Sequence, residues 1–184
     1  MKKFIGILLG IVLMVASASM ADALNYGSVT LSVSVSGDLS ISISPTTHSF
    51  GALAPGTQSV STAITVTNDS VGYLETYCFK GFNAGVWTLG ATQGANTYTL
   101  AAAFHGSAPL AAAFGAEDLM KSSGWDDVNG DKATTTKFSI DGTQTGASVN
   151  PGQARSLYFR LGMPSSSTTM GPLDVTATIT AILP

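Results

Sequence analysis

The chain has 184 residues and a formal net charge of −3 at pH 7, and only 10% of its residues are charged. So low a share of charge, in a sequence rich in glycine, serine, threonine and alanine, argues against a cytoplasmic enzyme. It also excludes the basic patches by which proteins bind nucleic acid or an anionic membrane. The composition is typical of exported, β-rich proteins.

The first 23 residues have the pattern of a signal peptide. Lys2 and Lys3 precede an apolar run over residues 4–15, and two Ala-x-Ala sites follow, the second ending at Ala23. The apolar run is shorter than the roughly 20 residues that a transmembrane helix needs, so we expect cleavage and no membrane attachment afterwards. The mature chain, residues 24–184, then forms one secreted domain.

Residues 29–43 alternate apolar and small polar side chains, which predicts a β-strand with one buried face. The apolar positions are Val29, Leu31, Val33, Val35, Leu39, Ile41 and Ile43. At about 3.3 Å per residue, one unbroken strand here would reach roughly 50 Å, longer than a typical sandwich strand. We therefore expect a division at Gly37: either the chain bends there within one domain, or residues 24–36 extend outward as a candidate donor strand for a neighbouring subunit.

Further strands are predicted in the first half of the mature chain at residues 60–66, 73–80, 86–89 and 96–104. In the last of these, the side chains of Tyr98, Leu100, Ala102 and Phe104 are in phase. Short connections with glycine, proline or Asn-Asp turn signals separate the strands. The pattern predicts consecutive strands of an all-β domain.

Residues 105–133 show no alternation and are too long for a structureless loop in a compact domain. Apolar residues and alanines over residues 109–121 predict a helical part, which Gly115 weakens. We interpret residues 105–133 as an insertion, helical in part, over one end of the domain.

Alternation resumes at residues 134–141, with Phe138 and Ile140 inward, and again at residues 156–161 and 173–183. Eight or nine strands with turn-rich connections predict an all-β, two-sheet sandwich of jelly-roll or immunoglobulin-like topology. A barrel is the alternative.

The sequence contains few groups suited to catalysis. His48 lies beside a predicted turn and His105 at a strand end, so both are expected to be structural or solvent-exposed. Nucleophile-elbow, phosphate-loop and zinc-spacing motifs are missing from the sequence, and we expect neither an enzyme nor a bound cofactor. The single cysteine, Cys78, excludes an intramolecular disulfide and is expected to be a buried thiol or an intermolecular bridge.

The best metal candidate is an acidic stretch within the insertion. Asp127, Asn129 and Asp131 place oxygen ligands at alternate positions, the spacing by which a tight loop wraps calcium. The match to an EF-hand loop is incomplete, because Lys132 replaces the required glycine and Phe138 replaces the bidentate glutamate. A solvated turn is the alternative.

Two tryptophans raise the possibility of a sugar-binding face. Trp87, Trp125 and the tyrosines offer flat apolar surfaces on which a pyranose ring can stack. Aromatic residues in strands are more often part of the core, and these are not grouped in the sequence.

Three motifs together with the export signal resemble a known family. They are residues 50–56 (FGALAPG), 64–68 (ITVTN) and 175–180 (VTATIT). They resemble secreted bacterial surface β-sandwich proteins of the TasA and camelysin biofilm-fibre type, and the last motif is also similar to the final strand of WxL-type wall-associated domains. The fibre-subunit resemblance implies a jelly-roll subunit whose N-terminal strand completes the sheet of the next subunit.

Two functions follow as expectations. The first is a secreted structural protein that assembles head-to-tail into an extracellular or cell-surface filament, with Val29, Leu31, Val33 and Val35 as the assembly strand. The second is a monomeric secreted module that binds a glycan or another ligand through residues 105–133. An exported hydrolase is the least favoured.

Overall fold

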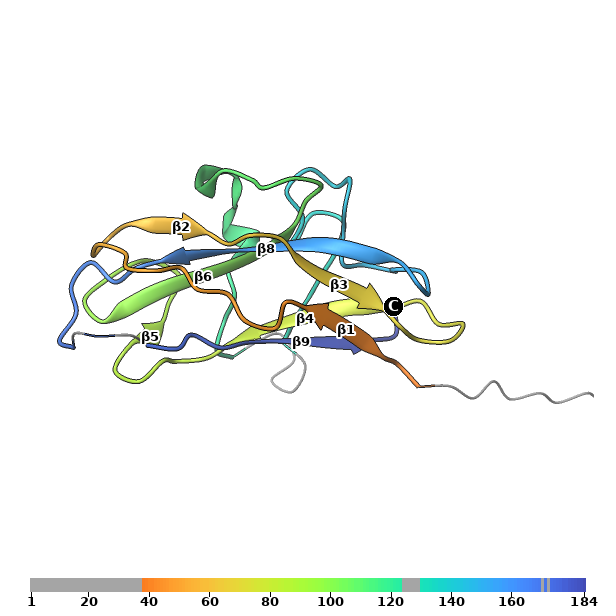
Figure 1. Cartoon of the computed structure of the whole chain (residues 1–184), viewed down its shortest axis with the longest axis horizontal. Helices are drawn as coiled ribbons and strands as arrows, with labels where there is room; N and C mark the ends of the chain where they lie inside the picture. Colours follow the sequence, from red (N-terminus) through yellow and green to blue (C-terminus); the bar gives the residue numbers. More distant parts are fainter. Residues whose placement is uncertain (1–37, 124–129, 170, 172) are drawn as a thin grey trace, which may run out of the picture. The chain divides into compact units, whose positions relative to one another are not determined.

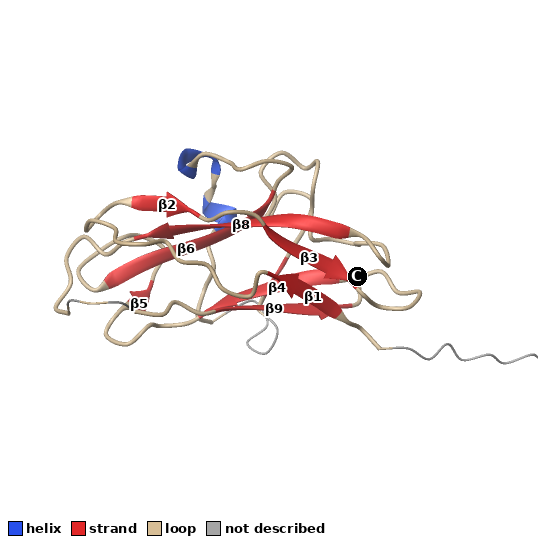
Figure 2. Ribbon diagram, in the orientation of Figure 1, coloured by secondary structure: helices blue, strands red, loops and turns tan. Residues whose placement is uncertain are grey.

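A computed structural model describes residues 38–123, 130–169, 171 and 173–184 (Figures 1 and 2). In chain order, the strands are β1 (Ile41–Ser44), β2 (Gln58–Val60), β3 (Ile64–Asn68), β4 (Thr76–Gly81), β5 (Thr88–Leu89), β6 (Thr97–Phe104), β7 (Asp131–Lys132), β8 (Ala154–Gly162) and β9 (Ala177–Ile182). They form two sheets, so the prediction of an all-β, two-sheet domain is confirmed. No helix in these residues is long and apolar enough to span a bilayer.

The larger sheet has the order β1-β3-β8-β6-β5, with β2 also paired to β8, and the smaller sheet has the order β7-β4-β9. Neighbouring strands are antiparallel except β5 and β6, which are parallel. In β1, Ile41 and Ile43 pack against the core while Ser42 and Ser44 are exposed. The predicted alternation is therefore confirmed over these residues.

The strand predicted at residues 60–66 is two strands with a β-bulge between them. Val60 in β2 faces Arg160, and Ile64 in β3 faces Leu157, so residues 61–63 lie opposite only two residues of β8. At the bulge, the Ser61 N–H donates to the Phe159 carbonyl (2.8 Å), and the Ser61 hydroxyl accepts from the Phe159 N–H (2.9 Å). The extra residue turns Val60 to the outer face of the sheet and leaves Ile64 in the main core.

The main core lies between the two sheets and is rich in aromatic rings. Phe79 of β4 lies 5.8 Å from the Phe104 ring of β6 and 4.6 Å from the Phe138 ring. The predicted inward face of β6 is confirmed, since Tyr98, Leu100, Ala102 and Phe104 all belong to this core. Burying side chains of this size contributes about 1.5–3 kcal/mol each to folding.

The prediction of a strand at residues 134–141 is wrong. The Thr134 hydroxyl accepts hydrogen bonds from the backbone N–H groups of Thr136 and Lys137, which makes a turn there. Phe138 then adopts a left-handed backbone with φ of 58°, which no strand residue has. Its ring is fully buried, as expected, but Ile140 packs on the opposite side of the larger sheet.

The first part of the insertion, up to Leu119, lies on the outer face of the larger sheet, whereas residues 131–132 form β7 of the smaller sheet. The described part of the insertion contains two 3-10 turns, η1 (Ala111–Ala113) and η2 (Ala116–Asp118), separated by Phe114 and an extended Gly115, in place of a longer helix. Phe114 packs on Ala101, Ala103 and Tyr158, which point outward from β6 and β8. Figure 2 shows both turns on the side of β6 and β8 away from the smaller sheet.

Candidate functional site

β9 is an edge strand whose inward side chains are incompletely covered. Among the described residues it pairs only with β4, and Ile179 and Ala181 stand opposite Phe79 and Tyr77. Phe79 and Tyr77 are fully buried, but Ile179 and Ala181 remain partly exposed. The edge of β9 therefore combines half-covered apolar side chains with backbone groups that face away from β4.

Many of the core side chains that are only partly buried lie on or next to the edge strands β1 and β9. β1 is the edge of the larger sheet and pairs only with β3 in the described structure. The partly buried residues on β1, on β9 and before β9 that pack on the core are Ile41, Ile43, Leu173, Val175, Ala177, Ile179 and Ala181. An added strand satisfies such an edge by pairing its backbone and covering these side chains.

The start of β1 is fixed by a buried carboxylate. The backbone N–H of Ser40 donates to Oε1 of Glu75 (2.8 Å), and the Ser40 carbonyl accepts from the backbone N–H of Asp69 (2.7 Å). Glu75 directly precedes β4 and is fully buried. The chain just before β1 is therefore held against the start of β4.

Glu75 and Tyr77 leave two buried polar atoms without a hydrogen-bond partner in the described structure, Glu75 Oε2 and Tyr77 Oη. Burial raises the pKa of Glu75, the Ser40 N–H opposes this rise, and the charge of Asp69 adds to it. Burial is also the main cause of the raised pKa of Tyr77, and the charge of Glu75 adds to that rise. The sandwich thus holds a titratable group beside the start of β1.

We expect Glu75 to make the protein less stable as the pH rises above the acidic range. The folded state binds its proton more tightly than the unfolded chain, so the free energy of unfolding is highest below the ordinary pKa of 4.5 and falls as pH rises through the raised pKa. Glu75→Gln keeps the acceptor for Ser40 but cannot ionise. Urea unfolding of both proteins from pH 4 upward should show a flatter pH dependence for the variant.

The raised pKa of Asp118 acts in the same direction but is present in both proteins, so it cancels in the comparison. Parallel curves for the wild type and Glu75→Gln would contradict the assignment to Glu75.

The predicted assembly residues Val29, Leu31, Val33 and Val35 lie outside the described residues. So do two of the predicted calcium ligands, Asp127 and Asn129. The third, Asp131, is buried in β7, and its Oδ2 lies 3.1 Å from Lys137 Nζ and 3.6 Å from Lys121 Nζ. No group of three metal-binding side chains occurs in the part of the chain that the structure describes. Calcium binding remains a prediction, which a calcium-dependent rise in melting temperature would support and a constant one would contradict.

Trp87 belongs to the core and not to an exposed platform. Its side chain is buried, lies 6.3 Å from the Tyr98 ring, and donates through Nε1 to the Ser167 hydroxyl (2.9 Å). Trp125 lies outside the described residues. A sugar-stacking face therefore cannot use Trp87 in this conformation.

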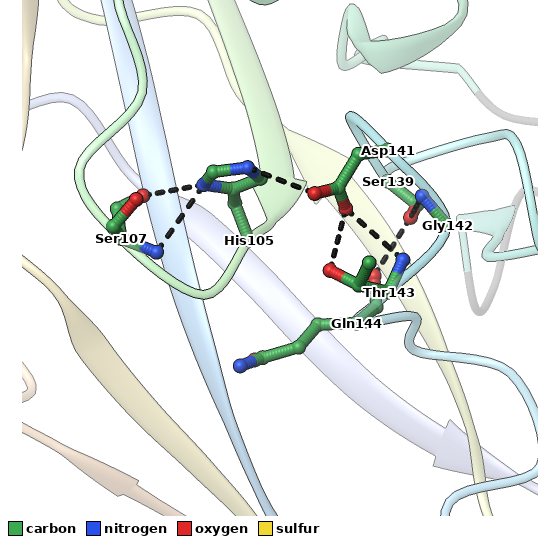
Figure 3. A network of polar contacts seen from close by, with 7 residues as sticks. All are labelled: His105, Ser107, Ser139, Asp141, Gly142, Thr143 and Gln144. Carbon is green, nitrogen blue, oxygen red and sulfur yellow. Dashed lines mark hydrogen bonds and ion pairs between the residues drawn. The ribbon is translucent and has the colours of Figure 1, made fainter.

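His105 clamps the end of β6 to the turn at residues 139–144 (Figure 3). Its Nε2 lies 3.1 Å from Asp141 Oδ2, and its Nδ1 lies 2.6 Å from the carbonyl oxygen of Ser107. The Thr143 hydroxyl and backbone N–H both donate to Asp141 Oδ1, and the hydroxyl bond is the main cause of the lowered pKa of Asp141. Ser107 contacts the imidazole through its backbone carbonyl and N–H, not through its hydroxyl. The contacts of His105 therefore link two loops and have a structural role.

The remaining two sequence candidates also make structural contacts. His48 packs edge-on against Phe50 at 4.7 Å, and its Nδ1 lies 3.3 Å from the Thr62 hydroxyl. Cys78 is buried in β4, as the first of its two expected roles requires.

A polar recess lies on the outer face of the larger sheet, beside the insertion. It has a volume of about 370 Å³ and is lined by Gln58, Ala91, Thr92, Gln93, Thr99 and Arg160. Arg160 donates through one terminal nitrogen to the carbonyls of Ala111 and Phe114, and its guanidinium lies 5.4 Å from the Phe114 ring. Burial lowers the pKa of Arg160, and the charge of the buried Asp118 opposes this shift.

Sequence reasoning missed Glu75. In the strand predicted at residues 73–80, Glu75 has the same parity as the inward aromatic residues Tyr77 and Phe79, so an acidic residue in phase with a core face was the available signal. Burying an unpaired charge on a core face is costly, so an acidic residue at such a position is a candidate for a specific role.

Comparison of the sequence with models of known protein families finds no match, and comparison with curated proteins finds none either. Function is therefore inferred from the residues and their geometry.

Proposed function

We propose that this chain is a secreted structural protein, a subunit of an extracellular or cell-surface filament that assembles by donor-strand exchange. The observation that carries the proposal is the edge of β9, where core side chains are half-covered and, among the residues that the structure describes, only one side of the strand is paired. Residues 29–35 repeat the same alternation in the segment that precedes β1. They supply the strand that covers this edge in a second copy.

The length of residues 29–35 matches that of β9, and the burial of their apolar side chains favours association. From Val29 to Val35 a strand extends about 20 Å, close to the length of the six residues of β9. Its four apolar side chains contribute roughly 1.5–3 kcal/mol each when buried, enough to offset a substantial part of the entropy lost on association. A head-to-tail contact of this kind does not close on itself, so it propagates as a filament.

Secretion is supported by the leader. Lys2, Lys3, the apolar run at residues 4–15 and the Ala-x-Ala site ending at Ala23 form a cleavable signal, and its removal places residue 24 at the start of the donor strand. Cleavage at this position leaves the donor strand as the free N-terminal segment of the mature chain. A jelly-roll or immunoglobulin-like topology is likewise inferred, supported by the passage of the chain between sheets from β3 to β4 and from β8 to β9.

Deleting residues 24–35 from the mature chain tests the proposal. We expect soluble folded monomer and no polymer by negative-stain microscopy, because the acceptor edge remains and the donor is gone. A synthetic peptide of residues 27–36 should then raise the melting temperature of the deletion variant. Loss of all folded protein would instead show that the strand belongs to its own sheet.

The polar recess favours a second function, a monomeric secreted module that binds a glycan or another small polar ligand. Gln58, Thr99 and Arg160 line this recess, and amide, hydroxyl and guanidinium groups can hydrogen-bond to sugar hydroxyls. Binding of pure monomer to a glycan array, lost in Gln58→Ala, would support this function. Failure to bind any glycan would leave the filament as the better assignment.

A further inference from the structure

Exposed large apolar side chains gather at two opposite ends of the described sandwich. The departure patch, at the end where β1 starts, consists of Leu39, Val71, Leu74 and Leu183. The entry patch consists of Phe82 and Val86, which follow the end of β4. Only Leu110, on the insertion, lies elsewhere among the exposed large apolar residues of the described chain. A clustered distribution of this kind marks an interaction surface more often than single exposed residues do.

Backbone contacts place the departure patch on one end. Ser40, next to Leu39, is bonded to Glu75, next to Leu74. Ile182 pairs with Thr76, so Leu183 lies at the same end, as Figure 1 shows for the C-terminus and the start of β1. Val71 lies in the turn that joins β3 to β4, which Asn68 holds by a hydrogen bond to the Tyr73 carbonyl.

The entry patch lies at the other end because β4 separates the two. Leu74 and Phe82 are eight residues apart along an extended chain, which corresponds to roughly 26 Å. Gly81, which precedes Phe82, pairs with Ala177 at the start of β9. The entry patch is therefore beside the first residue of the acceptor edge.

The direction of the donor strand, which rests on the proposed function, brings the two patches together. Pairing within the smaller sheet is antiparallel throughout, and antiparallel pairing is the more stable kind. A donor antiparallel to β9 places Val35 next to Ala177 of the acceptor copy. Four residue steps separate Val35 from Leu39 and reach at most about 14 Å, so Leu39 of the donor copy lies close to the acceptor's entry patch.

We propose that the departure patch of one copy packs on the entry patch of the next, as a second, end-to-end contact of the same filament. The occupant of each patch is a second copy of this chain. With six apolar side chains in all, the contact is smaller than a standard stable interface and acts only alongside strand exchange. It fixes the angle between successive subunits.

Cross-linking of a double cysteine variant, Val71→Cys with Val86→Cys, tests the contact in the full mature chain. A short bismaleimide should convert assembled protein into a ladder of covalent dimers, trimers and larger species, because each copy carries one cysteine for the contact at each of its two ends. A flexible linker avoids the strict geometry of a disulfide. Each single variant should give no covalent dimer, and Val71→Cys with Leu110→Cys should give no ladder. Cys78 is buried, and the unmodified protein controls for its reaction.

The outcomes separate this contact from the proposed function. Filaments without a ladder would overturn the end-to-end contact and leave strand exchange intact. A ladder that persists when residues 24–35 are deleted would show an end-to-end contact independent of the donor strand and would overturn its coupling to strand exchange. If neither filaments nor a ladder forms, both the end-to-end contact and the strand exchange are overturned. A covalent dimer from Val71→Cys alone would place departure patches against each other and contradict the antiparallel arrangement.

Discussion

Replacing Val33 with aspartate is expected to abolish filament formation and to leave a folded monomer. Val33 is in phase with the apolar positions of the donor strand, so its side chain is buried when the strand covers the β9 edge. The variant loses roughly 1.5–3 kcal/mol of apolar burial and must also desolvate a carboxylate. A loss of about 3 kcal/mol or more weakens association by more than about 100-fold. Negative-stain microscopy and size-exclusion chromatography measure the effect.

Ser34→Asp is the matched control, because Ser34 has the opposite phase and would face away from the acceptor in the proposed arrangement. It introduces the same charge one residue along the chain and should leave polymer formation within about twofold of the wild type, since isolated surface charges have small effects. Equal loss of polymer in both variants would point to charge repulsion and not to the buried face. An unfolded Val33→Asp monomer would place the strand in its own sheet.

Replacing Asn68 with alanine is expected to destabilise the sandwich by about 3 kcal/mol or more. Asn68 is fully buried at the end of β3, and its side chain makes four hydrogen bonds. The amide nitrogen donates to the carbonyls of Tyr73 (2.9 Å) and Val149 (2.8 Å), and the amide oxygen accepts from the Ser70 backbone N–H (2.9 Å) and hydroxyl (2.6 Å). Alanine removes all four bonds, each worth about 0.5–1.5 kcal/mol, and leaves the Ser70 N–H without its acceptor. The carbonyls of Tyr73 and Val149 keep the Ser70 hydroxyl and the Glu75 N–H as donors. Urea unfolding of the monomer measures the change.

Asp69→Asn is the control for this position, since Asp69 is exposed and adjacent. It should shift the free energy of unfolding by less than about 0.5 kcal/mol near neutral pH. A loss below about 1 kcal/mol in Asn68→Ala would show that the turn between β3 and β4 rearranges to give the Ser70 N–H another acceptor.

The strands with strict alternation and no interruption were predictable from the sequence. The β6 face is an example, because Tyr98, Leu100 and Phe104 belong to one core in the order that period two requires. The bulge at residues 61–63 was not predictable, since an extra residue leaves the local pattern unchanged and reverses the face of Val60 relative to Ile64. Sequence periodicity predicts which face of the sheet a side chain lies on only as long as no bulge interrupts the strand pairing.

Residues 134–141 show a second limit. Phe138 and Ile140 have the spacing of a strand, but a threonine-centred turn and a left-handed φ send them to different cores. The competing hydrogen bonds of the Thr134 hydroxyl are local chemistry that hydrophobic alternation does not detect.

The acceptor edge could not be predicted from the sequence, because it depends on which strand ends a sheet, a property of the whole topology. The donor half stays a prediction from the period-two alternation of residues 29–35. The ion pairs of Asp131 depend on the same long-range placement, because Lys121 and Lys137 are brought to it from both sides along the chain. Turn-forming residue types alone suggested a ligand loop there.

The position of the insertion has a consequence for how filaments meet one another. Phe114 and its neighbours bury Ala101 and Ala103 on the outer face of β6, a surface that would otherwise be flat and rich in small side chains. Flat sheet faces of that kind stack side by side in bundled fibres. With this face covered, we expect growth along one axis without lateral merging, and therefore thin, separate filaments whose width is that of a single subunit.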